Sequence, residues 1–520
     1  MARFLGFRGK SLEWALNLSV ILPSYILFGY NHAVAGGLLT LPAWTETFPS
    51  IDTVNTTGEA KIANSTLQGT VMAIYTLGCF FGSLSCIWVG DRLGRKRTIM
   101  LGAFINILGT AIQSTAFTIP ILTVGRLVTG FGFGHITATA PNWQAECCGA
   151  AHRGAVVLLE GVFISLGLAI AAWVDLAMSQ VHGSSVAWRF PLALSALWAI
   201  IVILATPFNP ESPRWLVKKN RMDEAKVVLA ALHDQEETGS EVTADIENIQ
   251  ESLAKSCEAK FSHLFHNGVG GQRLLHRTFL ACLIQVFHQL CGVNSLTFYE
   301  ATIFEDNLGL ASTAARILAA SVFTFQTVLS PVGVVTVDRF GRRKLMMFSA
   351  VGMGLCMAAM AGSTSQPHGN MAATAVAVTA IFLFSFFFPI GFLGLSFLYA
   401  TEMAPLSHRV PITALSTGVA WIFNFLVAEI TPMGFASIKY RYFIVYAALN
   451  FFLILPCVYF LFPETNGRKL EEIDEVFASA TSVLTTVKEA HLVHKRHLNS
   501  SSEESSNGEL GKAHMTQERR

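Results

Sequence analysis

The feature that most constrains this chain is a series of long apolar stretches that recurs along almost all of its length. Each stretch is about 20 residues long, which is the length an α-helix needs to cross the hydrocarbon core of a bilayer. The sequence therefore predicts an all-α integral membrane protein with twelve transmembrane helices. The predicted spans lie at about 14–39, 67–89, 98–117, 119–140, 155–179, 188–208, 278–302, 311–337, 345–362, 371–400, 410–435 and 442–462.

The composition supports a membrane protein. Of the 520 residues, 52% are hydrophobic and 14% are charged, whereas soluble domains average about 25% charged residues. The first apolar stretch is long and no small-residue cleavage site follows it, so we expect no cleaved signal peptide. The nine cysteines are scattered without metal-ligand spacing, so we expect no metal and no cofactor. We also expect no nucleic-acid partner.

Charge and sequons predict the orientation of the chain. Three basic residues precede the first span (Arg3, Arg8 and Lys10), which places the N-terminus in the cytoplasm by the positive-inside rule. The first loop, residues 40–66, would then lie outside. It contains two glycosylation acceptors, Asn55 and Asn64. We expect a multi-pass glycoprotein of the plasma membrane with both termini in the cytoplasm.

A basic turn occurs twice, each time after a predicted span. The first copy is Gly90–Arg97 and the second is Asp338–Lys344, about half the chain length later. Such spacing indicates a duplicated six-helix unit. The charges of these turns either regulate opening or are simply solvated. The predicted domains are a cytoplasmic N-terminus (1–13), an N-terminal six-helix bundle (14–208), a cytoplasmic linker of short amphipathic helices (209–277), a C-terminal six-helix bundle (278–477) and a disordered cytoplasmic tail (478–520).

Polar side chains interrupt the apolar stretch at 278–302. The segment His288–Tyr299 carries an imidazole, two amides and a phenol where a membrane helix usually carries Leu or Val. Such groups are costly in hydrocarbon, so they either line a substrate path or bind a neighbouring helix. The amides and the phenol can donate and accept hydrogen bonds but carry no charge, which favours a neutral polyhydroxylated ligand. One helical face carries Gln285, His288, Gln289, Gly292 and Tyr299, and a loosened helix at Gly292 would bring Asn294 to it.

These motifs together resemble the sugar porter family of the major facilitator superfamily, in particular fungal hexose transporters. The resemblance covers roughly residues 28–477 and implies two six-helix bundles with a sugar bound between them. It also implies alternating access controlled by charge networks at the inner face. The motifs that carry it are Gly90–Arg97, Gly125-Arg126, Pro141–Glu146 with Arg153-Gly154, Pro210–Leu216, Gln289–Tyr299, Asp338–Lys344 and Pro463–Gly467.

The resemblance also implies functional positions. Gln289, Asn294 and Asn424 match sugar-contacting residues of the family, whereas the chain departs from the family pattern at His288, Phe397 and Gln326 and has Gly161 in place of a frequent glutamine. The predicted substrate-binding set is Gln285, His288, Gln289, Asn294, Tyr299, Gln326, Phe397 and Asn424. The predicted gating set is Asp91, Arg92, Arg95, Glu146, Arg153, Asp338, Arg339, Arg342, Glu402 and Arg409.

We therefore expect a monomeric transporter of a monosaccharide, a hexose or pentose, and not an enzyme, because no nucleophile–base or metal constellation occurs. Facilitated diffusion is favoured over proton symport. Many proton-coupled members carry Asp where this chain has Asn31, close to an Arg like Arg126, and asparagine cannot titrate. Glu160 in the fifth span and Glu300 in the seventh are the alternative proton carriers. The other readings are a proton-coupled symporter of a sugar, polyol or sugar acid, and a nutrient sensor that does not transport.

Overall fold

The computed structural model describes residues 4, 6–148, 153–257, 264, 273–367, 370–405, 408–468, 470–480, 482–490 and 492–493. Almost all of this part of the chain is helical. Its N-terminal half contains α1 (Lys10–Leu16), α2 (Leu22–Leu38), α3 (Pro42–Thr47), α4 (Gly58–Leu93), α5 (Arg95–Ser114), α6 (Ile119–Cys147), α7 (Arg153–Ser179) and α8 (Val186–Ala205).

Three helices join the halves, and the second and third of them fall where the amphipathic patterns predicted helices. They are α9 (Pro213–Lys218), α10 (Met222–His233) and α11 (Ser240–Cys257). The C-terminal half contains α12 (Leu274–Leu290), α13 (Val293–Thr302), α14 (Ser312–Leu329), α15 (Pro331–Phe340), α16 (Arg342–Thr364), α17 (Met371–Phe388), α18 (Leu395–Met403), α19 (Arg409–Ile438), α20 (Arg441–Ala448), α21 (Leu455–Leu461) and α22 (Leu470–Ser479).

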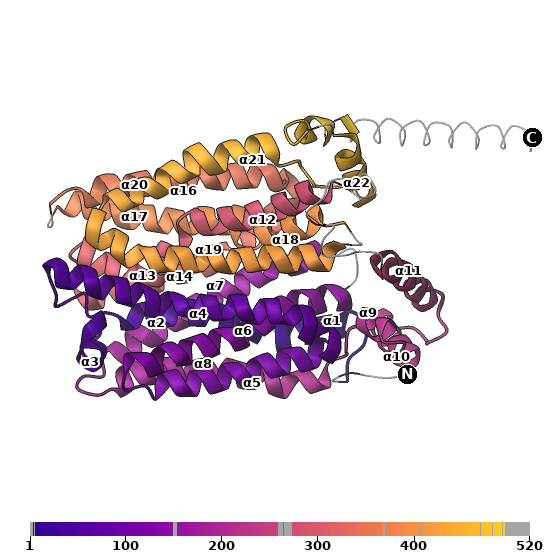
Figure 1. The fold of residues 1–520 in the computed structure, drawn as a ribbon, viewed down its shortest axis with the longest axis horizontal. Coiled ribbons are helices and arrows are strands. Elements are labelled where there is room, and N and C mark those ends of the chain that lie inside the picture. The colour runs from indigo at the N-terminus through magenta and orange to yellow at the C-terminus, as the bar shows by residue number, and fades with distance from the viewer. Residues whose placement is uncertain are drawn as a thin grey trace, which may run out of the picture.

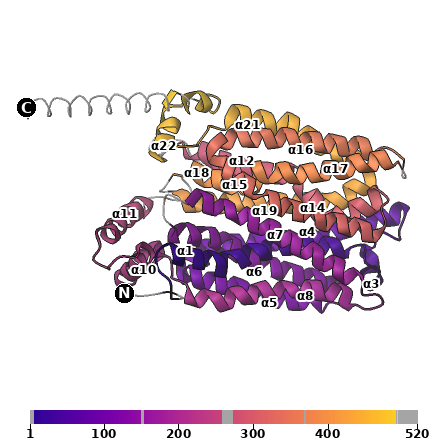
Figure 2. The same ribbon diagram turned by 180° about the vertical axis from the view of Figure 1, so that it is seen from behind.

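The long helices of the two halves form two bundles that lie side by side (Figures 1 and 2). Helices α9, α10, α11 and α22 lie at one end of the bundles, which we call the linker end. Helix α3 lies at the opposite end, which we call the far end. The duplicated unit that the sequence predicted is therefore present as two adjacent bundles.

Eleven of the described helices are long and apolar enough to cross a membrane. Helix α5 is not among them, although it corresponds to the third predicted span. It has 20 residues and packs between α6 and α8, but it begins with three basic residues and contains the buried Asn106. Its length and position make it the twelfth membrane helix.

Glycines bring α4 and α6 into backbone contact. A Cβ atom on Gly78 would lie 2.3 Å from the carbonyl oxygen of Leu127, and one on Gly130 would lie 2.0 Å from that of Tyr75. Such approach is possible only where the side chain is a hydrogen atom.

Two predicted segments differ in the structure. The loop at 40–66 contains α3 and the first nine residues of α4, so the second span starts earlier than its apolar residues do. The predicted start of the disordered tail, residue 478, is too early, because Val476 packs against Ala490 and Val493 in a buried cluster. Those contacts extend the ordered chain past residue 478, and residues 494–520 lie outside the described part.

Candidate functional site

A cavity of about 1370 Å³ lies between the two bundles. It extends from the middle of the membrane helices to the linker end, where Trp215, Leu229 and Asp245 line it. Its central part is polar and carries amide and aromatic side chains together with one carboxyl group, that of Glu160. The central side chains that line it include Tyr25, Phe28, His32, Glu160, Gln285, His288, Gln289, Asn294, Gln326, Phe397, Trp421 and Asn424.

A break between α12 and α13 builds the polar centre. Helix α12 ends at Leu290, and Gly292 has φ 104°, in the left-handed region that favours glycine. A Cβ atom there would lie 2.5 Å from Cε of Met357. The break turns Asn294 towards α12, so its Nδ2 donates to Oε1 of Gln289 at 2.5 Å. The predicted loosening at Gly292 is confirmed.

The amides form a connected network in the cavity wall. Oε1 of Gln289 also accepts a hydrogen bond from Nδ2 of Asn424 on α19, at 3.4 Å. Nδ2 of Asn424 lies 3.5 Å from Nε2 of His32 on α2. The ring of His32 stacks on Phe28, with 4.6 Å between ring centroids. The network therefore joins α12, α13 and α19 of one bundle to α2 of the other.

Several buried polar atoms of this wall make no hydrogen bond within the described residues. Both side-chain polar atoms of Gln285 belong to this group, as do Nε1 of Trp421 and Oδ1 of Asn424. All three residues line the cavity and are at most 5% exposed. Buried polar groups in native structures are almost always satisfied by protein, water or ligand. These three side chains therefore carry unused hydrogen-bonding groups beside the cavity.

His288, Phe397 and Gln326, where the chain departs from the family pattern, also line the cavity. Nδ1 of His288 lies 2.7 Å from Oγ of Ser396, which fixes the ring. The ring of Phe397 meets that of His288 edge-on, with 5.8 Å between centroids. Nε2 of Gln326 donates to Oγ of Ser165 in the other bundle at 3.1 Å.

Tyr299 is not part of the cavity wall, so its predicted substrate contact is not supported. Its hydroxyl donates to the carbonyl oxygen of Ala428 at 3.0 Å, and its side chain is 1% exposed. The helical wheel had placed Tyr299 on the same face as Gln285. The break at Gly292 resets the helical phase, so residues before and after it no longer share a face.

Trp421 and His32 are cavity residues that the predicted substrate set omitted. Trp421 lies three residues before Asn424, a spacing that places two residues on one face of a helix. That spacing was a usable signal. No comparable sequence pattern pointed to His32, because it reaches the network only through the packing of α2 against α19.

The predicted coupling residues lie in different surroundings. Arg126 donates from Nε to the carbonyl oxygen of Val71 at 2.8 Å and from Nη2 to that of Met72 at 2.9 Å. Asn31 is also buried, and neither residue lines the cavity. Glu160, in contrast, lines it. Backbone carbonyl groups therefore accept hydrogen bonds from the charged side chain of Arg126. Among the three predicted coupling residues, Glu160 is the one that lines the cavity.

The two basic turns fold alike at the linker end. Gly94 and Gly341 have φ 85° and 86°, and a helix begins directly after each. A glutamate caps each helix: Glu211 accepts from the backbone N–H of Arg95 at 3.0 Å, and Glu464 accepts from that of Arg342 at 2.9 Å. Burial raises the pKa of the Glu211 carboxyl group, whereas its backbone hydrogen bonds lower it.

Each turn also holds an ion pair within its own bundle. Nη2 of Arg95 lies 2.7 Å from Oε1 of Glu146, and Nη2 of Arg342 lies 3.0 Å from Oε1 of Glu402. All four side chains line the cavity near its linker end. Two of the remaining predicted gating residues form ion pairs: Asp91 with Lys218 at 2.6 Å and Asp338 with Arg342 at 3.0 Å. Arg92 and Arg339 are exposed, and Arg409 lines the cavity. The side chain of Arg153 lies outside the described part of the chain.

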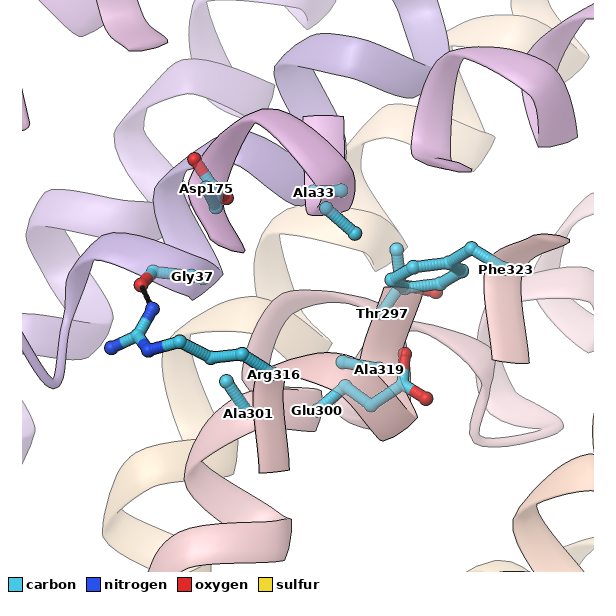
Figure 3. Close-up of a pocket in the computed structure, with 11 residues that line it drawn as sticks. Ala33, Gly37, Asp175, Thr297, Glu300, Ala301, Arg316, Ala319 and Phe323 are labelled. Atoms are coloured by element: carbon cyan, nitrogen blue, oxygen red, sulfur yellow. Dashed lines mark hydrogen bonds between the residues drawn. The ribbon is translucent and has the colours of Figure 1, made fainter. Parts of the chain in front are cut away.

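The far end is closed by contacts between the bundles (Figure 3). Arg316 of α14 donates to the carbonyl oxygen of Gly37, in the last turn of α2, and to Oγ1 of Thr40 at 2.6 Å. A cation at the C-terminus of a helix is favourable. Asp175 and Glu300 line a cavity of about 20 Å³ beside Arg316. The large cavity is therefore open towards the linker end while the bundles meet at the far end.

Residues 16–477 match the sequence model of a family described as "Sugar (and other) transporter". The chain belongs to this family. The MFS-type transporter oryC of Aspergillus oryzae is 36% identical over 466 residues, which are 88% of this chain and 84% of that protein. The sugar transporter STL1 of Saccharomyces cerevisiae is 32% identical over 481 residues, 91% and 83% of the two chains.

Solved structures share the fold of this family member. The proton:xylose symporter XylE bound to 6-bromo-6-deoxy-D-glucose superposes with a TM-score of 0.76, at 21% identity. The match covers 90% of this chain and all of that one. The partially occluded inward-open XylE of E. coli gives a TM-score of 0.71 over 88% of this chain and all of its own. The prediction of a major facilitator fold is confirmed, and the family consists of membrane transporters, not enzymes.

Proposed function

We propose that this protein carries a monosaccharide across a membrane, with hexoses such as glucose or pentoses as the substrate class. The observation that carries the proposal is the cavity centre, where the polar side chains of Gln285, Asn424 and Trp421 line a space between two bundles. Neutral donors and acceptors beside aromatic rings suit a molecule with many hydroxyl groups and apolar ring faces.

The charges in the cavity support a neutral substrate. The cationic side chains that line it include Arg95 and Arg342 of the two basic turns and Lys218 of the linker helix α9. The central wall on the C-terminal bundle carries amides and aromatic rings instead. A sugar acid would lack a cationic partner there, and a desolvated carboxylate without one is costly. Neutral sugars are therefore favoured over acids.

Alternating access explains the closed far end and the open linker end. We propose that the linker end faces the cytoplasm, as the basic N-terminus predicts, and that the protein acts in the plasma membrane. The structure then corresponds to an inward-open state. Rocking of the two bundles would break the contacts around Arg316 and close the cavity at the linker end.

We further propose facilitated diffusion. Asparagine at position 31 cannot take up a proton, and Arg126 is met by backbone carbonyl groups. Proton symport is the second candidate, because the carboxyl group of Glu160 lines the cavity and the fold neighbour XylE is a proton:xylose symporter.

Reconstituted liposomes separate the proposals. The purified full-length protein should equilibrate labelled glucose or xylose across the bilayer without accumulating it above the external concentration. A panel of hexoses, pentoses, polyols and sugar acids then defines the substrate. Accumulation driven by an imposed proton gradient and abolished by a protonophore would establish symport. No flux of any sugar, with correctly inserted protein, would refute the proposed function.

A further inference from the structure

Two buried carboxyl groups line the small cavity at the closed far end. Asp175 belongs to α7 and Glu300 to α13, and each residue is 3% exposed. Oδ1 of Asp175 and Oε1 of Glu300 have no hydrogen-bond partner within the described residues. The cavity of about 20 Å³ has room for a water molecule but not for the hydration of two carboxylates. A buried carboxyl group must then either meet a cation or bind a proton, because an unpaired buried charge is costly.

The guanidinium group of Arg316 lies beside Asp175 rather than Glu300. It donates to the carbonyl oxygen of Gly37 and pairs with Glu305, with 3.8 Å between Nε and Oε1. A Cβ atom on Gly37 would overlap Oδ2 of Asp175, so Asp175 lies directly beside the residue that Arg316 binds. In Figure 3 the guanidinium group extends towards Gly37, and the carboxyl group of Glu300 extends the opposite way. Among the described residues, Glu300 is therefore the carboxyl group of this cavity that no cation meets.

The other ionisable groups around this cavity make contacts of their own. Glu305, which follows α13, accepts hydrogen bonds from two hydroxyl groups, and Tyr30 on α2 donates to a backbone carbonyl group. Glu429 on α19 accepts a hydrogen bond from the hydroxyl of Thr70 on α4 at 2.7 Å. Within the described part of the chain, none of these groups brings a positive charge to Glu300.

We propose that Glu300 binds a proton from the far side when the bundles close there and releases it when they open. In the open state water hydrates the carboxylate. Closure removes that water, so the carboxylate and a proton taken from far-side water become a neutral carboxylic acid. The closed state then holds one more proton than the open state, so acid favours closure and alkali favours opening.

This inference rests on the proposed alternating access and adds a proton-binding site to it. Glu300 does not line the large cavity, so the site is separate from the space in which the sugar would bind. The proton returns to the side from which it came. The site therefore shifts the balance between the two states without driving accumulation of the substrate.

The test measures the distance between the two bundles at the far end, by pulsed EPR on the purified full-length protein. Spin labels are attached to Glu46→Cys in α3 and Met371→Cys, where α17 begins after α16 has run from the linker end; both positions are exposed, and the background lacks other cysteines. The ratio of far-end-open to far-end-closed molecules should rise from about pH 5 to about pH 8, by up to about tenfold per pH unit, as one proton released per opening requires.

Variants then identify the carboxyl group. Glu300→Gln keeps the side chain neutral, so the ratio should stay low and vary by less than about twofold over the same pH range. Asp175→Asn and Glu429→Gln are matched controls, because each removes another carboxyl group of the far end, and both should retain the pH response. Glu300→Ala replaces Glu300→Gln if the latter does not fold, and its ratio should likewise not depend on pH.

Two results would overturn this inference: a ratio in the otherwise unaltered protein that does not change with pH, or a full pH response in the Glu300 variant. No sugar is present in the measurement, so its outcome does not depend on the proposed substrate. An absence of sugar flux in liposomes, with the pH response intact, would instead refute the proposed function.

Discussion

At the scale of single residues, the site depends on neutral amides held in place by one another. Gln289 accepts hydrogen bonds from Asn294 and Asn424, so its orientation is set before a substrate enters. Preorganised groups lose little entropy on binding. Gln285, by contrast, makes no hydrogen bond within the described chain, so its amide keeps its hydrogen-bonding capacity for the proposed substrate.

Removal of these amides should therefore impair transport more than folding. We expect Gln289→Ala and Asn294→Ala to weaken sugar uptake by about tenfold or more, because each loses a hydrogen-bonding group worth about 1–3 kcal/mol in a desolvated site. Uptake kinetics at equal surface expression measure this. Asn106→Ala is the control, since Asn106 is a buried amide that donates to Thr129 away from the cavity. Normal uptake by both site variants would contradict the assignment.

The two sequons differ in their local structure. Asn55 is exposed in the segment before α4. Asn64 lies in α4, where its Nδ2 donates to the carbonyl oxygen of Asp52 at 2.8 Å and to that of Pro49 at 3.3 Å. Nδ2 of Asn55 also donates a hydrogen bond, to Oδ2 of Asp52 at 2.8 Å. Asn55 is exposed and lies outside a helix, however, whereas Asn64 is half-buried within one, which makes Asn64 the poorer acceptor for a glycan. We expect Asn55→Gln to remove the glycosidase-sensitive gel shift and Asn64→Gln to leave it; the reverse pattern would contradict this.

At the scale of single elements, breaks in the helices place the polar groups. The break between α12 and α13 turns Asn294 into the cavity, and a π-helical turn at Pro389–Leu393 separates α17 from α18, which carries Phe397. Irregular backbone at membrane depth is tolerated where it lines a cavity. These interruptions were visible in the sequence as glycine and proline within apolar stretches.

The break at Gly292 should be sensitive to any side chain. Gly292→Ala imposes a left-handed conformation on alanine and puts Cβ 3.1 Å from Cγ of Tyr446. We expect a loss of about 1–3 kcal/mol in stability and weaker sugar binding, measured as thermal unfolding in detergent with and without glucose. Gly362→Ala is the control, because its Cβ position has no atom within 4 Å. An unchanged melting temperature for Gly292→Ala would show that the break is not strained.

At the scale of the whole molecule, two similar bundles meet at the far end and separate at the linker end. The contacts around Arg316 join α14 to the C-terminus of α2. The ion pairs of Arg95 and Arg342, in contrast, each stay within one bundle. The far end therefore holds this state together through contacts between bundles, and the linker end leaves the cavity open.

Loss of the Arg316 contacts should shift the molecule towards a state open at the far end. Charge-assisted hydrogen bonds contribute about 1.5–3 kcal/mol, so Arg316→Gln should raise that population by at least about tenfold. An impermeant thiol reagent applied at the far side should then label a cysteine at position 33 faster, in a cysteine-free background. Arg441→Gln, which changes an exposed cation, is the control. Unaltered labelling in Arg316→Gln would contradict the proposed closure.

Disturbing the linker end should affect rate rather than affinity. Arg95→Ala and Arg342→Ala each remove an ion pair that positions a helix end beside the cavity mouth. We expect slower transport with an equilibrium affinity for sugar that changes much less. Arg97→Ala, an exposed cation of the same turn, should transport normally. If Arg95→Ala lost binding and kept its conformational exchange, its gating role would be wrong.

Sequence alone determined the class, the repeat and most of the polar residues of the site. Helix length in a bilayer is fixed by hydrocarbon thickness, so apolar stretches predict spans without tertiary information. Polar groups such as Gln289 and Asn294 are conspicuous there because burial in lipid is costly. The glycines that pack α4 on α6 recur at four-residue intervals, which is a local pattern of the sequence.

Only the tertiary structure decided which groups face the cavity. Tyr299 and Gln285 share a wheel position, but the left-handed Gly292 between them changes the helical phase. Glu211 and Glu464 cap helices that begin more than a hundred residues earlier, and His32 meets Asn424 across the two bundles. Contacts of this kind depend on how separate helices pack, and helix packing is set by the shapes of both surfaces together, which no local stretch of sequence contains.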